Sequence, residues 1–205
     1  MNHCDLHRII SDMQHGFRQK HSCESQLVIT LEEIARARDE GKQIDLLILD
    51  FTKAFDTVPH QRLLAKLKYY GIDGNLHKWV DNWLTGRNQT VVIDGERSSS
   101  KEVTSGVPQG TVLGPLMFLI YINDIQDSVQ YSTTRLFADD CLLYRVINNA
   151  QDSDKLQSDL TRLQEWSETW QMQFNPKKCY LLSMQRMRNP IRRDYTLRGE
   201  VLAPV

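Results

Sequence analysis

Two adjacent aspartates, Asp139 and Asp140, interrupt an otherwise apolar part of the chain. They stand between residues 136–138 and 141–143, two apolar runs whose side chains we expect to be buried. Neighbouring carboxylates repel one another, and burial raises the cost of keeping both charged. A divalent cation removes both penalties, because hard oxygen ligands suit Mg²⁺. The alternative that these residues leave open is an acidic turn that faces solvent.

A third carboxylate, Asp50, ends the apolar run of residues 44–49. A carboxylate at the end of a buried strand is placed either to bind a metal or to cap the next helix. If this strand and the strands around Asp139 and Asp140 are neighbours in one sheet, three carboxylates converge. Such a set holds two metal ions for phosphoryl transfer: one activates a hydroxyl, and the other stabilises the leaving pyrophosphate.

Residues 105–110 form a third segment suited to chemistry, because two glycines flank Pro108 and Gln109. Glycines allow the backbone to approach a ligand closely. Gln109 can hydrogen-bond a base or a sugar edge. Taken alone, the segment is better explained as a plain turn before a helix.

Hydrophobic periodicity predicts the elements that must position these residues. Helices are expected over residues 24–40, 59–70, 73–86, 116–125 and 154–171, and strands over residues 44–49, 133–138, 141–147 and 180–183. Residues 89–93 and 101–104 are expected to form a hairpin with Asp94-Gly95 as part of its turn, and residues 195–205 a further hairpin. We expect the first helix to bury Leu27, Val28, Leu31, Ile34 and Ala35. Asp139 and Asp140 are expected at the tip of a hairpin. This order of strands and helices predicts an α+β sheet covered by helices on one side.

Composition places the chain among ordinary globular proteins: of 205 residues, 40% are hydrophobic and 25% charged. The formal charge of −1 gives no indication of nucleic-acid binding. Basic clusters at residues 62–78 and 186–198 suit either a phosphate backbone or a solvated face. We see no secretory signal, and four irregularly spaced cysteines favour a reducing compartment. We therefore expect an intracellular protein of the nucleus or cytoplasm that does not bind a membrane.

Four segments in order resemble motifs A, B, C and D of reverse transcriptases. They are Asp-Phe-Thr-Lys-Ala-Phe-Asp at 50–56, Gly-Val-Pro-Gln-Gly at 106–110, Phe-Ala-Asp-Asp at 137–140 and Asn-Pro-Lys-Lys at 175–178. The finer pattern is similar to non-LTR retrotransposons of the jockey-like and chicken-repeat-like kind. Supporting segments lie at 14–18, 112–116 and 121–124, with Trp166 and Trp170. Each motif is weak alone, but four in order are specific.

The resemblance implies an α+β fold: a right-hand polymerase palm, an antiparallel sheet backed by helices, with partial fingers and the thumb missing. It assigns residues 1–43 to partial fingers, 44–185 to the palm with a fingers-like excursion near 59–105, and 186–205 to the truncated start of the palm–thumb junction. Relatives carry a basic strand pair with an Arg-Pro-Ile-like signature before the segment that starts at Gln14, and none is seen here. We therefore expect a fragment, without endonuclease or RNase H modules.

The resemblance also implies residue roles. Asp50, Asp139 and Asp140 match the catalytic metal ligands, with the Phe51 carbonyl as a supplementary ligand. Lys178 matches a lysine that protonates the departing pyrophosphate, although Lys177 beside it is an alternative.

Further residues match the nucleotide site. The amides of Lys53, Ala54 and Phe55 match the turn that meets the nucleotide's phosphates. The Phe55 ring matches the gate that excludes a 2′-hydroxyl. Gln109 and Gly110 match the loop that faces nucleotide and template.

The implied activity is that of an RNA-directed DNA polymerase, which transfers a nucleotide from a deoxynucleoside triphosphate to a primer 3′-OH. The implied cofactor is a pair of Mg²⁺ ions, for which Mn²⁺ can substitute. The implied partners are an RNA template with a DNA primer, and the oligomeric state stays open. Alternatives are a catalytically silent nucleic-acid-binding remnant and a metal-dependent phosphohydrolase. A zinc cluster of His3, Cys4, His7, His21 and Cys23 fits no usual finger spacing.

Overall fold

The computed structural model describes residues 4, 6–185 and 189–205, and the chain divides into two compact units. The first, which we call the sheet unit, contains Met1–Thr52 and Asn123–Val205. The second, the helical unit, contains Lys53–Ile122. Within the described part of the chain, we find no helix that is both long and apolar enough to span a bilayer.

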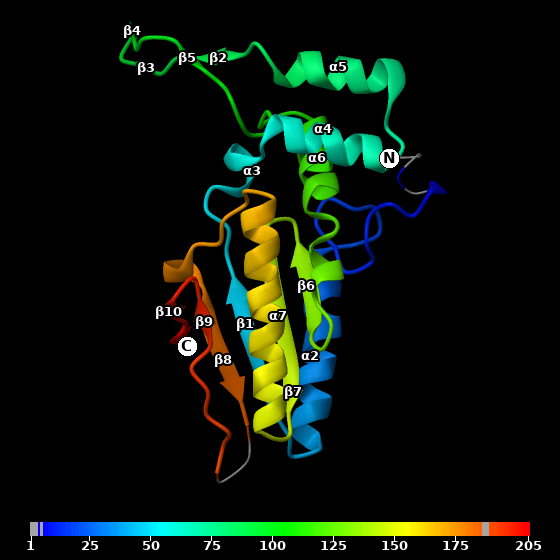
Figure 1. Cartoon of the computed structure of the whole chain (residues 1–205), viewed down its shortest axis with the longest axis vertical. Helices are drawn as coiled ribbons and strands as arrows, with labels where there is room; N and C mark the ends of the chain where they lie inside the picture. The colour runs from blue at the N-terminus through cyan, green and yellow to red at the C-terminus, as the bar shows by residue number, and fades with distance from the viewer. Residues whose placement is uncertain (1–3, 5, 186–188) are drawn as a thin grey trace. The chain divides into compact units, whose positions relative to one another are not determined.

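A five-stranded sheet forms the centre of the sheet unit (Figure 1). Its strands are β1 (Gln43–Leu49), β6 (Thr133–Phe137), β7 (Asp140–Ile147), β8 (Tyr180–Met184) and β11 (Ala203–Pro204). They lie in the order β11-β8-β1-β7-β6, and every pair is antiparallel except β11 with β8. In the middle, Leu46 of β1 lies opposite both Tyr144 and Leu182. The apolar run predicted as a buried central strand is therefore the middle strand of the sheet.

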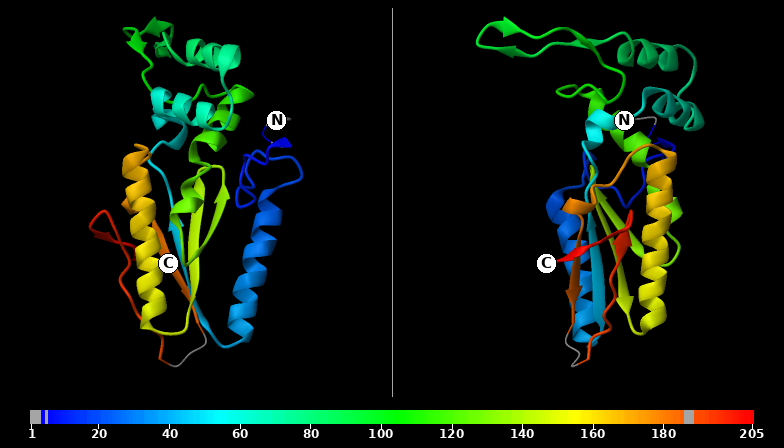
Figure 2. Two further views of the ribbon diagram at one scale, coloured as in Figure 1. Left: turned by 45° about the vertical axis from the view of Figure 1, so that its right-hand side comes forward. Right: turned by 60° about the vertical axis from the view of Figure 1, so that its left-hand side comes forward.

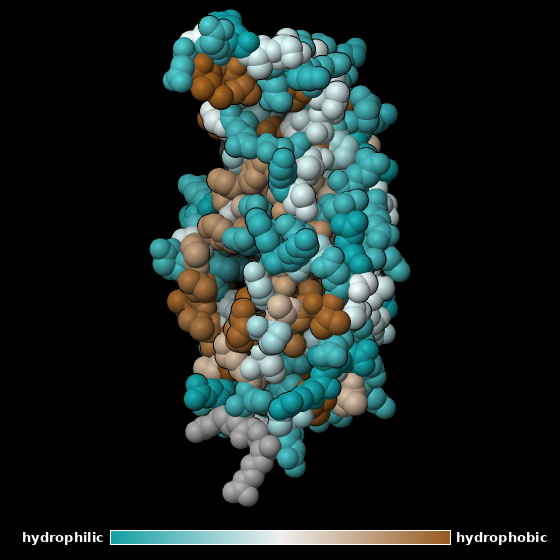
Figure 3. Space-filling view, turned by 90° about the vertical axis from the view of Figure 1, so that its left-hand side faces the viewer, coloured by the Kyte–Doolittle hydropathy of each residue, from teal (hydrophilic) through white to brown (hydrophobic). Residues whose placement is uncertain are grey.

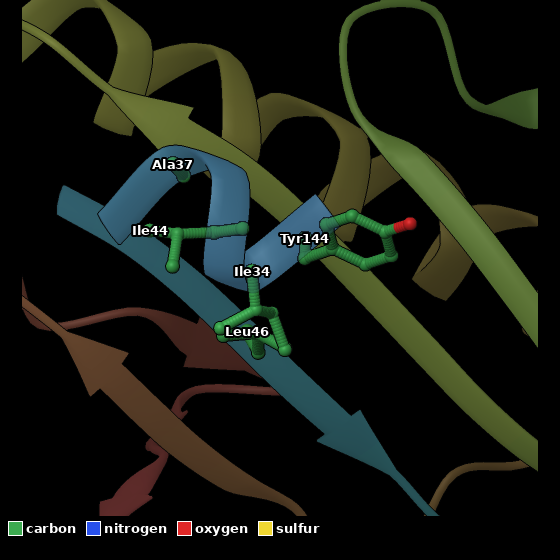
Figure 4. Packing of buried hydrophobic residues seen from close by; sticks show 5 residues of the cluster. All are labelled: Ile34, Ala37, Ile44, Leu46 and Tyr144. Carbon is green, nitrogen blue, oxygen red and sulfur yellow. The ribbon is translucent and has the colours of Figure 1, made fainter. Parts of the chain in front are cut away.

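Helices cover both faces of this sheet (Figure 2). Helix α2 (Cys23–Asp39) packs on β1 and β6, and α7 (Ala150–Thr169) packs on β7. Figure 4 shows Ile34 and Ala37 of α2 against Ile44 and Leu46 of β1. The prediction that helices cover one side only is wrong. Successive strand residues point to opposite faces, and the next residue, Leu47, is also fully buried, so both faces need a cover.

Helix α2 starts where a capping box begins, but it buries a different face from the predicted one. The Ser22 side chain accepts from the Ser25 amide, and the Ser25 side chain accepts from the Ser22 amide. Leu27, Val28 and Leu31 are 53%, 65% and 55% exposed, so their predicted burial is wrong. The buried face consists of Gln26, Thr30, Ile34 and Ala37. Tertiary packing on the sheet, and not the local hydrophobic pattern, therefore selects which face of α2 is buried. Apolar residues remain on the surface of the sheet unit (Figure 3).

Helix α7 begins at Ala150 instead of near Asp154, because Asn149 caps it by accepting a hydrogen bond from the Asp152 amide. Its predicted core positions are confirmed: Leu156, Leu160, Leu163 and Trp166 are buried. Trp170 lies at the C-cap and is only half-buried.

The chain after α7 returns to the sheet and is anchored there. It contains the short helix η2 (Pro176–Lys178) and a hairpin of β9 (Thr196–Leu197) and β10 (Glu200–Val201), as predicted for 195–205. The other short helix of the sheet unit, η1 (Ile125–Ser128), lies earlier in the chain and precedes β6. Buried Asp45 of β1 accepts hydrogen bonds from the Tyr195 hydroxyl at 2.8 Å and the Ser183 hydroxyl at 2.6 Å. A satisfied buried carboxylate therefore ties the C-terminal segment to the central strand.

The helical unit is built around an almost wholly apolar helix. Its elements are α3 (Ala54–Thr57), α4 (His60–Tyr69), α5 (Gly74–Leu84), β2 (Asn88–Gln89), β3 (Val92–Ile93), β4 (Glu96–Arg97), β5 (Lys101–Glu102) and α6 (Leu113–Ile122). Helix α6 begins before the predicted Leu116, because the Thr111 hydroxyl accepts from the Gly114 amide. It ends at Ile122, short of the predicted Ile125. Fully buried Leu63 and Leu67 belong to α4, which packs on α6 and α5.

The predicted hairpin of the helical unit is two nested pairs. β3 pairs with β4 around the predicted Asp94-Gly95 turn, and β2 pairs with β5 outside it. One residue of the basic cluster 62–78 faces inward: Lys66 is 3% exposed and donates to the Tyr121 carbonyl. Its ammonium is therefore not part of a solvated or phosphate-binding face.

Candidate active site

The pairing of β1 with β7 brings Asp50 and Asp140 to the same edge of the sheet. Leu49 lies opposite Cys141, so Asp50 follows β1 where Asp140 begins β7. Two segments that are far apart in the sequence thus meet through an antiparallel register. The condition set by the sequence, that the two strands be neighbours, is met.

The acidic hairpin turns one residue earlier than predicted. Phe137 pairs with Asp140, so the two-residue turn is Ala138-Asp139, and Asp140 is already part of β7. The prediction of an Asp139-Asp140 tip is therefore wrong. Ala138 adopts a left-handed conformation with φ of 53°, which is uncommon for a residue with a Cβ atom.

Gln14 clamps this turn, a role that sequence reasoning missed. It is 2% exposed; its Oε1 accepts from the Ala138 amide at 2.8 Å, and its Nε2 donates to the Ala138 carbonyl at 3.1 Å. A Cβ atom on Gly16 would lie 2.2 Å from the Ala138 nitrogen, so only glycine fits there. The signal that could have pointed to this clamp is the Gln-His-Gly segment at 14–16, which the family resemblance had marked only as supporting.

Asp140 is the carboxylate of this set whose charge is opposed by its surroundings. Burial raises the pKa of Asp140, and the charges of Asp139 and Asp50 raise it further. One carboxylate oxygen of Asp50, Oδ2, is buried without a hydrogen-bond partner. Lys178 Nζ lies 3.3 Å from that oxygen. This is an ionic contact without hydrogen-bond alignment, and it leaves the acceptor capacity of Asp50 incompletely used.

The segment that carries Lys178 is fastened to Asp50 through the backbone. The Asn175 amide donates to the Asp50 carbonyl at 2.8 Å, and the Asp50 amide donates to Cys179 Sγ at 3.4 Å. The Asn175 side chain in turn caps η2 at Lys177. Motif D therefore meets motif A directly, and of its two lysines Lys178 is the one paired with Asp50.

The carboxylates suit a hard cation in chemistry but do not form a closed cage. Among residues 4, 6–185 and 189–205, no three His, Cys, Asp or Glu side chains are grouped closely enough to hold one ion. This applies to the acids and to the zinc alternative, of which His3 lies outside the described residues. The Asp50 oxygen that lacks a hydrogen bond and the repulsion at Asp140 are nevertheless what a divalent cation would relieve.

Phe51, whose carbonyl was the predicted supplementary ligand, has its ring in the core of the sheet unit. The ring stacks on Phe174 with centroids 4.2 Å apart, and a backbone bridge joins the same two residues. Trp166 lies at 6.4 Å from it. The backbone at the end of β1 is therefore firmly held.

A cavity of about 180 Å³ lies beside Asp50 and Asp140, in the sheet unit. Its walls are mostly apolar and come from α2, β1 and the hairpin: Leu27, Thr30, Ile48, Leu49, Phe137, Cys141 and Leu142, with Gln26 and Arg135. Burial raises the pKa of the Cys141 thiol to about 12, so this cysteine is inert at neutral pH.

The helical unit carries the remaining predicted residues. Lys53 adopts a left-handed conformation with φ of 48° at the N-cap position of the single turn α3, without a side-chain capping hydrogen bond, and Ala54 in that turn is buried. The Phe55 ring stacks on Phe118 of α6, with centroids 4.2 Å apart and planes inclined by 22°. The apolar helix thus fixes the orientation of the ring predicted to select the sugar.

The glycine-rich loop packs against this turn within the same unit. The Val107 amide donates to the Phe55 carbonyl at 2.8 Å. Gly106 has a φ of +89°, and a Cβ atom there would lie 2.8 Å from the Asp56 carbonyl oxygen. Close backbone approach therefore explains this glycine. Gln109 and Gly110 are exposed beyond it.

Comparison with solved structures identifies the fold. Telomerase from Candida albicans, solved in complex with a TWJ fragment of telomeric RNA, matches 93% of this chain and 33% of its own, with a TM-score of 0.62 and 12% identity. Telomerase from Candida tropicalis, with the same kind of RNA fragment, matches 89% of this chain and 32% of its own, with a TM-score of 0.62 and 11% identity. The fold is thus a right-hand polymerase palm: an antiparallel-dominated sheet backed by helices.

Sequence comparison then gives the family. Residues 1–192 match the family described as reverse transcriptase (RNA-dependent DNA polymerase), and the chain belongs to it. Members of this family use divalent metal ions.

Named relatives come from transposons of Drosophila melanogaster. The probable RNA-directed DNA polymerase from transposon X-element is 34% identical, over 85% of this chain and 20% of its own length. The one from transposon BS is 30% identical, over 95% of this chain and 22% of its own length. The chain therefore spans about a fifth of the length of these curated relatives. In a second species, Drosophila funebris, the RNA-directed DNA polymerase from mobile element jockey is 32% identical, over 85% of this chain and 20% of its own length, which confirms the resemblance to jockey-like non-LTR elements.

Proposed function

We propose that this chain is the palm, with part of the fingers, of an RNA-directed DNA polymerase. The reaction transfers a nucleotide from a deoxynucleoside triphosphate to a primer 3′-OH on an RNA template. The observation that carries the proposal is the β1–β7 register, which brings Asp50 and the Asp139-Asp140 pair to one edge of the sheet. Family membership and the telomerase-like fold support it.

In this proposal Asp50, Asp139, Asp140 and the Phe51 carbonyl hold two Mg²⁺ ions, or Mn²⁺ in their place. The ions would supply charge stabilisation to the attacking hydroxyl and the leaving pyrophosphate. Lys178 acts beside Asp50 as the acid that gives a proton to the pyrophosphate. Its exposed ammonium and its position next to Asp50 support that role.

The helical unit binds the nucleotide in the same proposal. The amides of Lys53 and Ala54 meet its phosphates, and the Phe55 ring excludes a 2′-hydroxyl. Gln109 and Gly110 face nucleotide and template. The partners are then deoxynucleoside triphosphates and an RNA template with a DNA primer, in the nucleus or cytoplasm.

Primer extension on poly(rA)-oligo(dT) by the purified chain, with and without Mg²⁺, tests the proposal. We expect Mg²⁺-dependent incorporation of at least single nucleotides, lost in Asp139→Asn, which keeps the side-chain shape and removes the charge. The second candidate is a silent nucleic-acid-binding remnant, favoured by the absence of a closed three-ligand metal group among the described residues. It predicts that the chain binds the duplex with unchanged affinity in Asp139→Asn and extends nothing.

A further inference from the structure

The residue after the predicted sugar gate, Asp56, makes a side-chain contact that has no role in the reaction outlined above. Gln109 Nε2 donates a hydrogen bond to Asp56 Oδ1 at 2.6 Å. Both side chains are exposed, and both line a cavity of about 630 Å³ in the helical unit, together with Lys53 and Arg87. The contact joins the turn of motif A to the loop of motif B.

This contact is not needed to hold the two segments together. The Ser105 hydroxyl donates to the Asp56 carbonyl at 2.9 Å, and the Gly106 amide donates to the Val58 carbonyl at 2.8 Å. A backbone bridge also joins Pro59 to Ser105. An exposed side-chain hydrogen bond adds little stability to segments already fastened by their backbones. A role other than stability therefore accounts better for the pair.

The chemistry of the two groups supplies that role. A glutamine amide has a donor end and an acceptor end, and rotation by half a turn exchanges them. An ionised carboxylate only accepts hydrogen bonds, so Asp56 can receive only the NH₂ end of Gln109. One N–H of Gln109 is then engaged. Its Oε1 and its second N–H are left for a ligand.

We propose that Asp56 is a positioning residue that fixes the amide orientation of Gln109, so that Gln109 offers one acceptor and one donor to the incoming nucleotide. This inference rests on the proposed function, because it assumes that Gln109 meets the nucleotide. Asp56 has no contact with substrate in this scheme. It acts through Gln109.

Equilibrium binding of dTTP tests the proposal with the full chain on poly(rA)-oligo(dT) ended by a dideoxynucleotide, so that no chemistry is required. We expect Asp56→Ala and Gln109→Ala each to raise the Kd of dTTP about tenfold, and the double variant to be no weaker than Gln109→Ala. Groups that act as one unit give such non-additive losses. Independent, multiplying losses would overturn the proposal.

Asp56→Asn separates orientation from contact. Asparagine offers a donor and an acceptor, so Gln109 can bind it in either orientation. We expect an intermediate loss of affinity. A Kd equal to that of the unaltered chain would show that the charge of Asp56 orients nothing.

Glu102→Ala is the matched control, because Glu102 is an acid of the same cavity but lies on β5, where its backbone position is opposite Asn88 of β2. Removing an acid near bound phosphates weakens no phosphate contact, so this variant should bind dTTP as well as, or better than, the unaltered chain. An equal loss in Glu102→Ala would assign the effect of Asp56→Ala to the cavity as a whole, against the proposal.

Hydrogen exchange of the Gln109 side-chain amide, followed by NMR, keeps this inference apart from the proposed function. We expect slowed exchange of one of the two amide protons, lost in Asp56→Ala. If both protons exchange as in a free amide, the positioning role is refuted, whatever the chain binds. If dTTP fails to bind but the slowed proton is present, the proposed function fails while the orientation of Gln109 by Asp56 stands.

Discussion

At the residue scale, the proposed metal site requires negatively charged carboxylates that repel one another when no cation is bound. The charges of Asp139 and Asp50 act on Asp140, whose pKa burial also raises. Asp140→Asn removes one charge from this set, so we expect a melting temperature on the order of 1–2 °C higher without divalent ions. The stabilisation that added Mg²⁺ gives to the unaltered chain should shrink in the variant. Thermal melting with and without MgCl₂ measures both effects, and a variant stabilised by Mg²⁺ as strongly as the unaltered chain would remove Asp140 from the metal site.

Also at the residue scale, Phe55 should set the choice of sugar. Its ring is held by stacking on Phe118, so it cannot move aside easily for a 2′-hydroxyl. We expect Phe55→Val to raise the ratio of kcat/KM for ribonucleotides over deoxyribonucleotides by at least about tenfold. Phe55→Tyr keeps the ring and should keep the ratio. An unchanged ratio in Phe55→Val would leave the ring with a packing role only.

At the element scale, the start of α7 depends on one buried carboxylate. Burial opposes the ionisation of Asp152, but hydrogen bonds from Arg145 and from the Asn148 amide outweigh it and hold the pKa of Asp152 below its ordinary value. A lowered pKa means that this stabilisation is present above the unfolded pKa and is lost as the pH falls through the folded one. We expect Asp152→Asn to lower the free energy of unfolding at pH 7 by about 1–3 kcal/mol. Urea unfolding from pH 7 to pH 3 checks the prediction, and a difference that stays constant over that range would contradict it.

At the scale of the whole molecule, only part of the basic clusters at 62–78 and 186–198 is available to bind the phosphates of a nucleic acid. Lys66 is buried. In the cluster at 186–198, Arg186 and Arg188 lie outside the described residues; of the others, Arg193 pairs with Asp154, Arg198 donates to Gln173, and Arg192 is exposed. We expect weak, salt-sensitive binding of a template–primer and little processive synthesis by these 205 residues alone. Arg192→Ala should reduce the slope of log Kd against log salt by about 0.9, as for one phosphate contact. Arg36→Ala, which removes a charge paired with Glu32 on α2, should leave the slope unchanged.

The sequence by itself determined the family, the palm-type fold and the residues able to do chemistry. The residues able to do chemistry follow from local information: an apolar run that ends at Asp50, two acids between apolar segments, and glycines around Gln109. The family and the palm-type fold follow from the resemblance of four ordered motifs to those of reverse transcriptases. The roles of those residues stay predictions, because neither the fold nor the relatives test them. The types of the long helices and of the central strand were equally predictable, because periodicity and capping residues are written into neighbouring positions.

Only the tertiary structure decided which groups meet. Burial of the Gln26–Ala37 face of α2, in place of Leu27, Val28 and Leu31, follows from where the sheet lies. The one-residue shift of the acidic turn follows from the register of β6 and β7 and from the clamp by Gln14. The pairing of Asp56 with Gln109 joins segments that no local pattern connects. Contacts between distant segments arise from long-range packing and register, and a single sequence records neither.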